Sequence, residues 1–319
     1  MNNEVAIIIL NYKNWRDTIE CLESVFKITY QPYRVIVVDN DSQNGSLDEI
    51  EKWFNSNQIL PLRLTQQQSE QAAFENNPVV LIQSASNRGY AAGNNIGIRW
   101  AIRGGDPYVL ILNNDTIVQK DFLEPLADFL DKNHDTAMVG PLLKKPTGEI
   151  DRTCARIRPT FWDYFLRIGP AKTIWRQNPW YQSVWYFQNN ALVLPFDVEV
   201  ISGSCVLVRM NFLKTIGLLD EHTFLFAEEY ILSEQIKRSK KTIFVIPQSS
   251  VIHKHGQSIK KSVSSFMLKT IIGSHFYYLR KYRSFSTVRA MICLFWLWVI
   301  FLKVKACECT SGCCKKLQN

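Results

Sequence analysis

Short apolar runs alternate with amphipathic stretches over the first 140 residues of the chain. Runs with the length and β-branched content of buried strands lie at residues 5–10, 34–38, 79–82, 109–112 and 137–139. Between them, apolar side chains at helical spacing predict helices at residues 15–26, 47–54, 90–103 and 122–129, whereas the polar stretch 66–77 predicts a surface loop. Strands that alternate with helices favour parallel βαβ units in a doubly wound α/β sheet.

The pattern changes after Pro141. Residues 153–198 are rich in Trp, Tyr, Phe and Pro and have no clear period, and their aromatic part, 161–187, is a candidate lid or subdomain. Strand-like runs then follow at 200–209, 242–246 and 251–253, with short helical patterns at 211–216 and 227–239, and the chain from 264 onward reads as helical. We expect three parts: residues 1–140, residues 141–260 in the same domain, and a C-terminal segment, 261–319.

The C-terminal segment contains an uncharged apolar run at residues 290–302, flanked by Arg289 and Lys303. A membrane-spanning helix needs about 20 apolar residues, so this run is too short to span comfortably. It predicts an interfacial helix with Trp296 and Trp298 at the level of the lipid headgroups, and a buried core helix is the alternative.

Composition and charge narrow the class of protein. The 46% hydrophobic content supports a large core and excludes global disorder. Much of the net charge of +8 lies late in the chain beside the apolar run, which favours a membrane surface over nucleic acid as the partner. The start of the chain lacks the basic segment and cleavage site of a signal peptide. The scattered cysteines indicate a reducing compartment. We therefore expect a cytoplasmic location, peripheral to the inner face of the plasma membrane.

The cysteine-rich tail is an exception to that scatter. Cys307, Cys309, Cys313 and Cys314 lie close together, but no second Cys pair or His stands at zinc-finger spacing. A soft-metal site and acylation near a membrane are the weaker interpretations of these thiols.

Polar side chains follow each of the first four predicted strands in the sequence. These strand ends are Asn11-Tyr12, Asp39-Asn40-Asp41, Asn87-Arg88-Gly89 and Asn113-Asn114-Asp115. Ligands of doubly wound sheets bind beyond the carboxyl ends of the strands, so these groups should converge. Asp39 suits a base or ribose and Asp115 a divalent cation on a diphosphate, although strand-end acids also cap helices. Neither G-x-G-x-x-G nor a P-loop is present, which disfavours a dinucleotide fold.

Six segments of the sequence resemble family 2 glycosyltransferases, in the subgroup with bacterial rhamnosyltransferases and O-antigen or capsule transferases. In chain order they are VAIIILNYKNWRDTIECLESV, VIVVDNDSQNGS, NRGYAAGNNIGIRWA, YVLILNNDTIV, ISGSCVLVRMNFLKTIGLLDEHTFLFAEEYILSEQIK and VIPQSSVIHKHG. Together they cover residues 4–256. The resemblance implies a GT-A fold, a nucleoside-diphosphate sugar donor, Mg²⁺ or Mn²⁺ as cofactor, and inversion at the anomeric carbon. Residues 1–140 would then bind the nucleotide sugar and 141–260 the acceptor.

The resemblance also assigns roles to individual residues. The metal ligands would be Asp115 and His253, with His255 as a substitute, and Arg280 would meet the diphosphate. A general base would come from the pair Glu228-Glu229, with Glu229 favoured by alignment; the alternative is that both acids only favour a helix N-terminus. The donor nucleotide would contact Asn11, Tyr12, Asp39, Asn40, Asp41, Asn87, Arg88, Gly89, Asn94, Asn113 and Asn114.

The expected reaction is a single displacement by a hydroxyl of a lipid-linked or polysaccharide acceptor in surface polysaccharide synthesis. The subgroup suggests a dTDP- or UDP-linked sugar such as rhamnose. A sugar nucleotidyltransferase is disfavoured because the chain has no Gly-rich basic loop after the first strand. A degenerate, non-catalytic membrane partner is disfavoured by the acids at 39, 115, 228 and 229.

Overall fold

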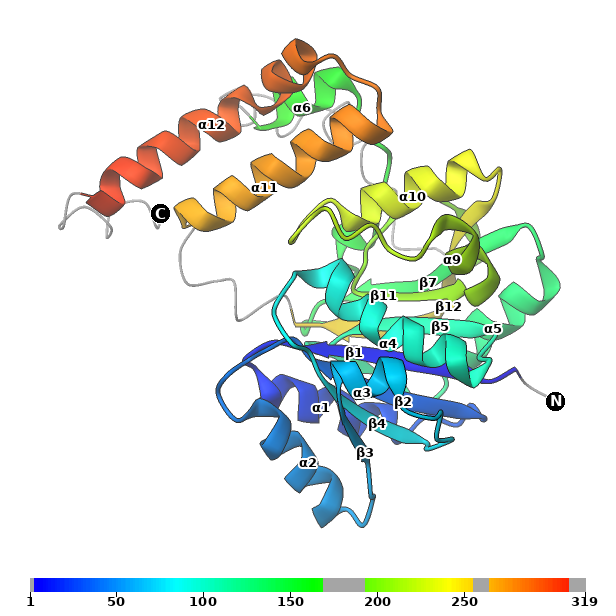
Figure 1. Ribbon diagram of the computed structural model, residues 1–319. Coiled ribbons are helices and arrows are strands. Elements are labelled where there is room, and N and C mark those ends of the chain that lie inside the picture. Colours follow the sequence, from blue (N-terminus) through cyan, green and yellow to red (C-terminus); the bar gives the residue numbers. More distant parts are fainter. Residues whose placement is uncertain (1–2, 169–192, 255–263, 310–319) are drawn as a thin grey trace.

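A large mixed sheet flanked by helices forms the centre of the computed structural model, which describes residues 3–168, 193–254 and 264–309 (Figure 1). Within these ranges the strand order is β3-β4-β2-β1-β5-β11-β7-β12-β6, with β9 paired to β12. The strands are β1 (Val5–Asn11), β2 (Tyr33–Asp39), β3 (Leu62–Thr65), β4 (Val79–Gln83), β5 (Tyr108–Asn113), β6 (Thr116–Val118), β7 (Thr136–Lys144), β9 (Phe196–Asp197), β11 (Cys205–Arg209) and β12 (Thr242–His253). A separate antiparallel pair joins β8 (Ala155–Arg156) to β10 (Val200–Ile201).

The register of the parallel strands aligns their carboxyl ends. β1 pairs in parallel with β2 and β5, and Asn11 stands opposite Asp39. β11 is antiparallel to both β5 and β7, while β12 is parallel to β7. The prediction of a GT-A-type, mostly parallel sheet is confirmed. β11 of the second predicted half lies beside β5 of the first, and β7 on its other side crosses the predicted boundary at residue 140, so the two halves share one sheet.

The described helices mostly follow the predicted amphipathic stretches. They are α1 (Trp15–Val25), α2 (Ser46–Ser56), α3 (Gln66–Gln71), α4 (Tyr90–Gly104), α5 (Leu123–Lys132), α6 (Phe161–Ile168), α9 (Met210–Ile216), α10 (Glu228–Arg238), α11 (Ser265–Tyr277) and α12 (Thr287–Cys309), with a 3₁₀ turn η1 (Arg152–Cys154) and a π-helical turn η2 (Tyr278–Tyr282). Small residues bring α4 close to β1, because a Cβ at Gly93 would lie 2.6 Å from Leu10 Cδ1. This close packing holds the loop 87–90, which leads into α4, against the sheet.

Three sequence predictions differ from the structure in their details. The stretch 66–77 begins with α3 rather than a loop, because Thr65 and Gln68 form a capping box that nucleates it. The strand-like run 200–209 is interrupted at residues 202–204, and the two runs at 242–246 and 251–253 form one strand, β12, with a shift in register after Ile246. These errors arise because caps and bulges depend on single residues, while periodicity reports only burial.

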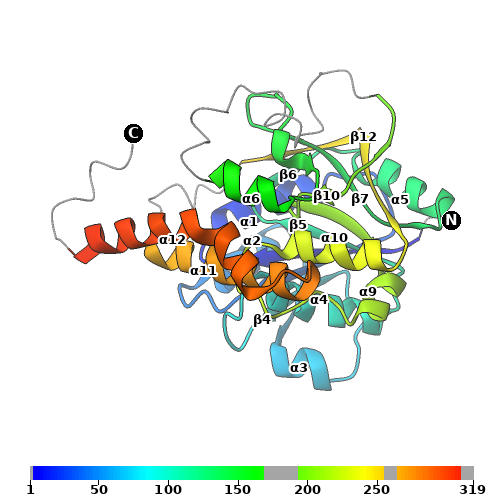
Figure 2. The ribbon, with the colours of Figure 1, turned by 90° about the horizontal axis from the view of Figure 1, so that it is seen from above.

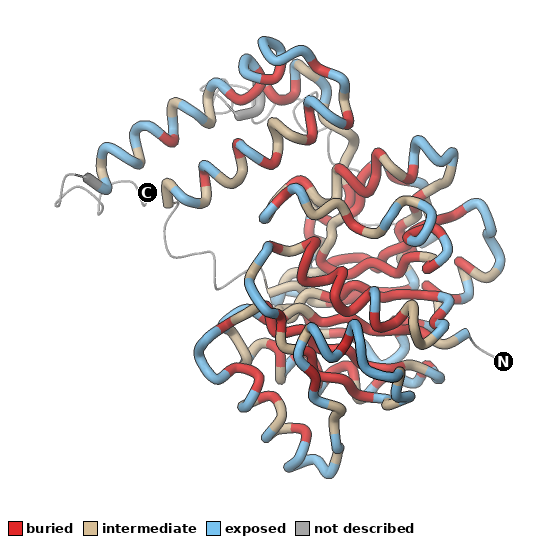
Figure 3. The backbone as a smooth tube through the Cα atoms, in the orientation of Figure 1, coloured by how far each residue is buried: buried red, intermediate tan, exposed pale blue. Residues whose placement is uncertain are grey.

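The C-terminal helices pack together as a second layer. α11, η2 and α12 form a hairpin, which contacts α6 and α10 through a separate hydrophobic cluster that includes Tyr164, Ile231, Leu268, Tyr278 and Leu294. Figures 1 and 2 show α11 and α12 lying side by side and projecting beyond the sheet. In Figure 3 buried positions are concentrated in the sheet, whereas α12 alternates between buried and exposed positions.

α12 is longer than the uncharged run suggested. It has 23 residues, and its part Thr287–Glu308 is long and apolar enough to cross a membrane by length and composition, with 17% of its most apolar window buried. The expectation that this segment is too short to span was therefore wrong in its premise. The helix continues past Lys303, because lysine is a good helix former and its charge does not end a helix.

Candidate functional site

Asp39 is the hub of a buried polar cluster at the carboxyl ends of three strands. Its Oδ1 accepts hydrogen bonds from Asn11 Nδ2 and Ser42 Oγ, both at 2.6 Å, and its Oδ2 accepts from Gln83 Nε2 at 3.0 Å. The predicted convergence of residues from β1 and β2 is thus present, joined by Gln83 of β4. Beside the cluster lies a cavity of about 290 Å³ lined by Asp39, Asp41, Gln43, Gly45, Ser46, Leu47, Asp48, Arg63, Gln83 and Ser84. Its mixed donors and acceptors can bind the edge of a heterocycle.

The loop 87–90 lies against this cluster. Asn40 Nδ2 donates to Asn87 Oδ1 at 3.0 Å and to the Gly89 carbonyl at 3.2 Å. Gly89 has φ +99°, and a Cβ there would lie 2.1 Å from the carbonyl oxygen of Phe224. Only glycine permits both this backbone conformation and this close approach. Gly89 therefore allows the loop to contact the segment before α10.

Replacing Gly89 by alanine should destabilise the fold and disrupt this contact. At φ +99° and ψ −174° the backbone of Gly89 lies in a region that is essentially restricted to glycine, which costs another residue about 1–3 kcal/mol, and the clash with backbone adds to it. The matched control is Gly105→Ala, because Gly105 has φ +78° and open space around its Cβ position. We expect Gly89→Ala to unfold at a clearly lower Tm than Gly105→Ala in thermal melts. Equal Tm values would show that the loop yields to the methyl group.

A larger cavity of about 400 Å³ lies between the sheet and α10. Tyr90 lines it, and its hydroxyl, which lies 2.9 Å from the Gly203 carbonyl and 3.1 Å from Asn113 Oδ1, can donate its one hydrogen to either acceptor. Apolar side chains of β5, β7, β10, β11 and α10 form much of the wall. Its polar lining is Tyr90, Asn113, Thr153, Arg156, Ser202, Ser204, Glu228, Glu229, Tyr230, His253 and His275. Polar and titratable groups that converge in one partly apolar cavity are typical of an active site.

The start of α10 presents two acids to this cavity. Phe226 and Ala227, just before it, are both left-handed, with φ of 73° and 68°. Such backbone costs about 1–3 kcal/mol per residue and is often retained at functional sites. Directly after this pair, Glu228 and Glu229 in the first turn of α10 both line the cavity.

The two acids have different environments. Burial raises the pKa of Glu228 to about 7, although its own backbone N–H and that of Phe226 oppose the shift. Its Oε1 is buried and has no hydrogen-bond partner among the described residues. Glu229 instead forms an ion pair with Arg156 of β8. Burial thus brings the pKa of Glu228 close to neutral pH, whereas the Glu229 carboxylate is held by a cation.

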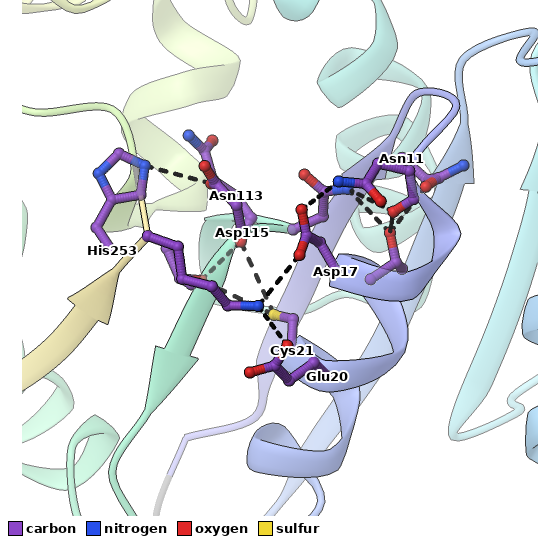
Figure 4. A network of polar contacts seen from close by, with 12 residues as sticks. Asn11, Asp17, Glu20, Cys21, Asn113, Asp115 and His253 are labelled. Carbon is purple, nitrogen blue, oxygen red and sulfur yellow. Dashed lines mark hydrogen bonds and ion pairs between the residues drawn. The ribbon is translucent and has the colours of Figure 1, made fainter. Parts of the chain in front are cut away.

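Asp115 and His253 lie next to each other (Figure 4), and His253 also lines the larger cavity. His253 Nε2 lies 3.2 Å from Asp115 Oδ1, and its Nδ1 lies 3.4 Å from Ser204 Oγ. The next residue, Lys254, fixes the end of β12 to α1 by pairing with Glu20 and, at 3.1 Å, with Asp17. The predicted metal ligands are thus adjacent in space although 138 positions separate them in the printed sequence.

This pair fits a divalent cation only as part of a larger ligand set. One carboxylate and one imidazole provide suitable O and N donors, and both side chains are mostly buried. The described ranges contain no group of three or more His, Cys, Asp or Glu side chains arranged to hold a metal. Mg²⁺ and related ions commonly use one or two carboxylates plus substrate phosphates and water, so a two-residue site is consistent with an ion that binds together with a diphosphate.

Other predicted site residues have their contacts elsewhere. Arg88 is exposed and forms an ion pair with Glu221 at 3.1 Å, while Asn94 is buried and donates to the Tyr90 carbonyl. Asn114 Nδ2 donates to Thr18 Oγ1, and Tyr12 is exposed. Arg280 donates to the Phe285 carbonyl at 2.5 Å and does not line the cavity. Their roles in donor binding stay predictions.

Sequence reasoning missed three parts of the cavity wall. Arg156 lies in the aperiodic aromatic region, and His275 lies in the helical segment in which Arg280 was singled out. Neither position carries a recognisable sequence signal. The break at Ser202-Gly203-Ser204 does carry one, because a glycine inside a strand-like run indicates a bulge or a close backbone approach.

Comparisons with known proteins agree with this geometry. Residues 6–217 match glycosyl transferase family 2. The chain is 23% identical over 279 residues to an N-acetylglucosaminyl-diphospho-decaprenol L-rhamnosyltransferase of Mycobacterium tuberculosis, covering 84% of this chain and 81% of the relative. It is 21% identical over 267 residues to the dTDP-rhamnosyl transferase RfbF of Shigella flexneri, covering 82% and 72%.

A solved structure shares the fold. The mannosyltransferase PcManGT from Pyrobaculum calidifontis, in complex with GDP-Man and Mn²⁺, superposes with a TM-score of 0.55 at 13% identity, covering 98% of this chain and 76% of that one. At this identity the likeness concerns the fold alone. Because the family match spans most of the sheet and the strand-end residues that converge there, the chain belongs to glycosyltransferase family 2, whose members transfer a sugar from a nucleotide-sugar donor.

Proposed function

We propose that this protein is an inverting, metal-dependent transferase that moves a sugar from a nucleoside diphosphate to a hydroxyl of a lipid-linked or polysaccharide acceptor. The observation that carries the proposal is Glu228, an acid with a pKa near 7 that lines the same cavity as Asn113 and His253. A base that titrates near the working pH is suited to accept a proton from an attacking hydroxyl. The acids near the two cavities also disfavour a degenerate, non-catalytic chain.

In the proposed reaction the chain's residues divide between donor and acceptor. The cluster around Asp39 and the cavity beside it would bind the nucleoside. Asp115 and His253 would hold the divalent cation, which when bound stabilises negative charge on the leaving diphosphate. Glu228 would take the proton from the acceptor hydroxyl as its oxygen attacks the anomeric carbon from the face opposite the leaving group. Glu229, paired with Arg156, would hold the cavity wall in place.

The names of the relatives suggest the substrates. Both the mycobacterial and the Shigella relative transfer rhamnose by name, and the first acts on a diphospho-decaprenol. We propose a dTDP- or UDP-linked deoxyhexose as donor and a lipid-linked saccharide in surface polysaccharide synthesis as acceptor. The partly apolar cavity beside Tyr230 is compatible with a sugar ring, because saccharides present apolar faces to aromatic side chains.

We further propose that α12 docks the enzyme on the cytoplasmic surface of the membrane. One side of α12 packs into the second hydrophobic cluster through Ala290, Cys293 and Leu294. The other side leaves apolar side chains in solvent: Val288, Met291, Ile292, Phe295, Trp298, Ile300 and Leu302. Arg289, Lys303 and Lys305 accompany them, and cations beside an apolar face favour an anionic lipid surface. Because α12 is packed along one side, a peripheral position keeps that packing intact.

Placing charge on the outer side of α12 should release the protein from membranes. We expect Phe295→Asp with Trp298→Asp to reduce binding to anionic phospholipid vesicles at least about tenfold, since burying one large apolar side chain contributes about 1.5–3 kcal/mol. Leu60→Asp is the matched control, because Leu60 is also exposed but lies far from α12 between α2 and β3. Vesicle flotation measures the effect. Unchanged flotation of the double variant would overturn the docking role of α12.

Release of nucleoside diphosphate by the purified protein tests the proposed activity. A panel of UDP-, dTDP- and GDP-sugars is incubated with Mn²⁺ or with chelator, in the presence and absence of a polyprenyl-diphosphate saccharide. We expect turnover of one donor, dependent on the metal and accelerated by the lipid acceptor. Absence of turnover together with absence of a nucleotide-induced thermal shift would contradict the proposal.

A further inference from the structure

The segment between α9 and α10, residues 217–227, is held from two sides. On the donor side, the Phe224 carbonyl accepts from Tyr90 N at 2.8 Å, and the Leu219 carbonyl accepts from Asn95 Nδ2 at 2.8 Å. On the other side it contacts the C-terminal hairpin. Loop 217–227 therefore joins the nucleotide half of the sheet to the helices that carry the exposed apolar face.

Asp220 forms the first contact with the hairpin. Its Oδ2 accepts hydrogen bonds from the hydroxyls of Tyr282 at 2.5 Å and Tyr277 at 2.7 Å, and Lys281 Nζ lies 3.3 Å away. Burial opposes ionisation of Asp220, but these hydroxyl donors and the backbone N–H of His222 more than offset it and hold the pKa of Asp220 below its ordinary value. The carboxylate is thus charged throughout the neutral range, and hydrogen bonds to a charged acceptor are the stronger kind.

A second contact lies at the other end of the loop. Ser274 Oγ of α11 donates to the Leu225 carbonyl at 2.8 Å. The next two residues, Phe226 and Ala227, are the left-handed pair that precedes Glu228. Strained backbone persists only where its surroundings determine it from several directions. The two hairpin contacts supply one of those directions.

We propose that Asp220 is a positioning residue that ties the C-terminal hairpin to loop 217–227 and thereby sets the position of Glu228 and Glu229 for transfer. This rests on the proposed role of the two acids. It makes the membrane-docking helices a support of the catalytic cavity as well as an anchor. His275 of the same hairpin lines that cavity, and its ring nitrogen Nδ1 lies 2.8 Å from the Tyr164 hydroxyl, so the hairpin also contributes directly to the wall.

The test removes the two hydroxyls and keeps the rings. Tyr277→Phe with Tyr282→Phe leaves the stacking of His222 on Tyr277, whose planes are 9° apart, and the cation–π contact of Arg238 with Tyr282. Asp220→Asn is the second variant. Tyr108→Phe is the matched control, because Tyr108 also donates its hydroxyl to an aspartate, Asp131, but at the opposite end of β5.

We expect the double variant to lose about 10- to 100-fold in kcat for transfer, as small misplacements of catalytic groups do, with donor KM and vesicle binding unchanged. In the double variant the rise of kcat with pH should also occur at a lower pH than in the wild type, because a more hydrated Glu228 loses its proton more easily. Tyr108→Phe should shift neither. A double variant with the kcat and pH profile of the wild type would overturn the proposal.

Amide hydrogen exchange tests the link between the hairpin and loop 217–227 without requiring any turnover. Amides of residues 220–229 should exchange faster in the double variant and in Asp220→Asn than in the wild type and in Tyr108→Phe. Unchanged exchange rates in both variants would show that Asp220 does not hold loop 217–227 to the hairpin, even if the enzyme is active. A wild type with neither turnover of any donor nor a nucleotide-induced thermal shift would instead contradict the proposed function, and the exchange data would still decide whether Asp220 holds the loop.

Discussion

Replacing Glu228 by glutamine is expected to lower kcat for sugar transfer about 10²- to 10⁴-fold, the usual contribution of a general base. Glutamine keeps the size and the backbone contacts of Glu228 but has no carboxylate to accept the acceptor's proton. Donor binding should be preserved, because the cluster around Asp39 lies elsewhere. Steady-state kinetics with the lipid acceptor and nucleotide titration measure the two effects separately.

The pH dependence identifies which acid acts. A base must be deprotonated, so kcat of the wild type should rise with pH through about 7, where Glu228 loses its proton. Other charged and titratable groups line the same cavity and contribute to the electrostatic field around Glu228. They are Arg156 of β8, Tyr90 of α4, His253 of β12, His275 of α11 and Glu229 of α10. Burial and the nearby Arg156 lower the pKa of His275 to about 4, so this histidine does not titrate in the same window.

Glu229→Gln is the matched variant. It removes the partner of Arg156 and should weaken the cavity wall, but the acidic limb of kcat near pH 7 should remain. Alignment favours Glu229 as the base, whereas the environments of the two acids favour Glu228. A Glu228→Gln enzyme that keeps its kcat, beside a Glu229→Gln enzyme that loses it and the limb, would return the role to Glu229.

Glu228→Gln should also stabilise the folded protein at alkaline pH. Between its ordinary pKa of 4.5 and about 7, Glu228 keeps its proton when folded and loses it when unfolded, so the free energy of unfolding decreases as pH rises through this window. Each pKa unit corresponds to about 1.4 kcal/mol, so relief of this penalty is worth at most roughly 3.5 kcal/mol. Glu228→Gln should therefore gain Tm relative to the wild type at pH 8 and not at pH 4.5. Active sites commonly trade stability for function in this way.

Sequence periodicity located the sheet because buried strands must be apolar and parallel strands must end at one edge. That rule was sufficient to bring Asn11 to Asp39, which are hydrogen-bonded in the structure. The rule did not predict that Asp115 lies near His253. Only the resemblance paired these two residues, because β12 reaches β6 by antiparallel pairing that no pattern in either strand predicts. Strands that are short or at a sheet edge, such as β3 and β6, have too few residues for a period to be visible.

The acceptor-side wall could not be predicted for a different reason. Arg156 belongs to a two-residue strand, and His275 belongs to a helix whose apolar residues point in several directions. Neither residue therefore lies in a segment with a periodic signature. The aromatic stretch 161–187 is described only as far as α6, and its proposed role as a lid lies outside the described residues. Cavities built from tertiary contacts between distant segments depend on packing, which single-sequence patterns do not encode.

Replacing Asp115 by asparagine is expected to lower metal-dependent turnover of the donor about 100-fold or more, because a carboxylate lost from a divalent-cation site removes several kcal/mol of charge stabilisation. Asparagine keeps the size of the side chain, and the backbone carbonyl of Asp115, which accepts from Lys254 N at 3.0 Å, is untouched. The Mn²⁺ concentration for half-maximal activity should rise. His253→Ala should have a smaller effect of the same kind, since it removes a neutral ligand.

The control for Asp115 is Asp128→Asn, which removes a carboxylate of α5 whose partner is Lys132, one helical turn away. We expect Asp128→Asn to match the wild type in both kcat and Mn²⁺ dependence. Titration of Mn²⁺ with and without nucleoside diphosphate distinguishes a site completed by the diphosphate from one held by protein alone: because the described residues offer only a pair of ligands, binding of the metal should strengthen when the diphosphate is present. Wild-type turnover that is indifferent to chelator, with full activity of Asp115→Asn, would show that the leaving diphosphate is stabilised by side chains alone.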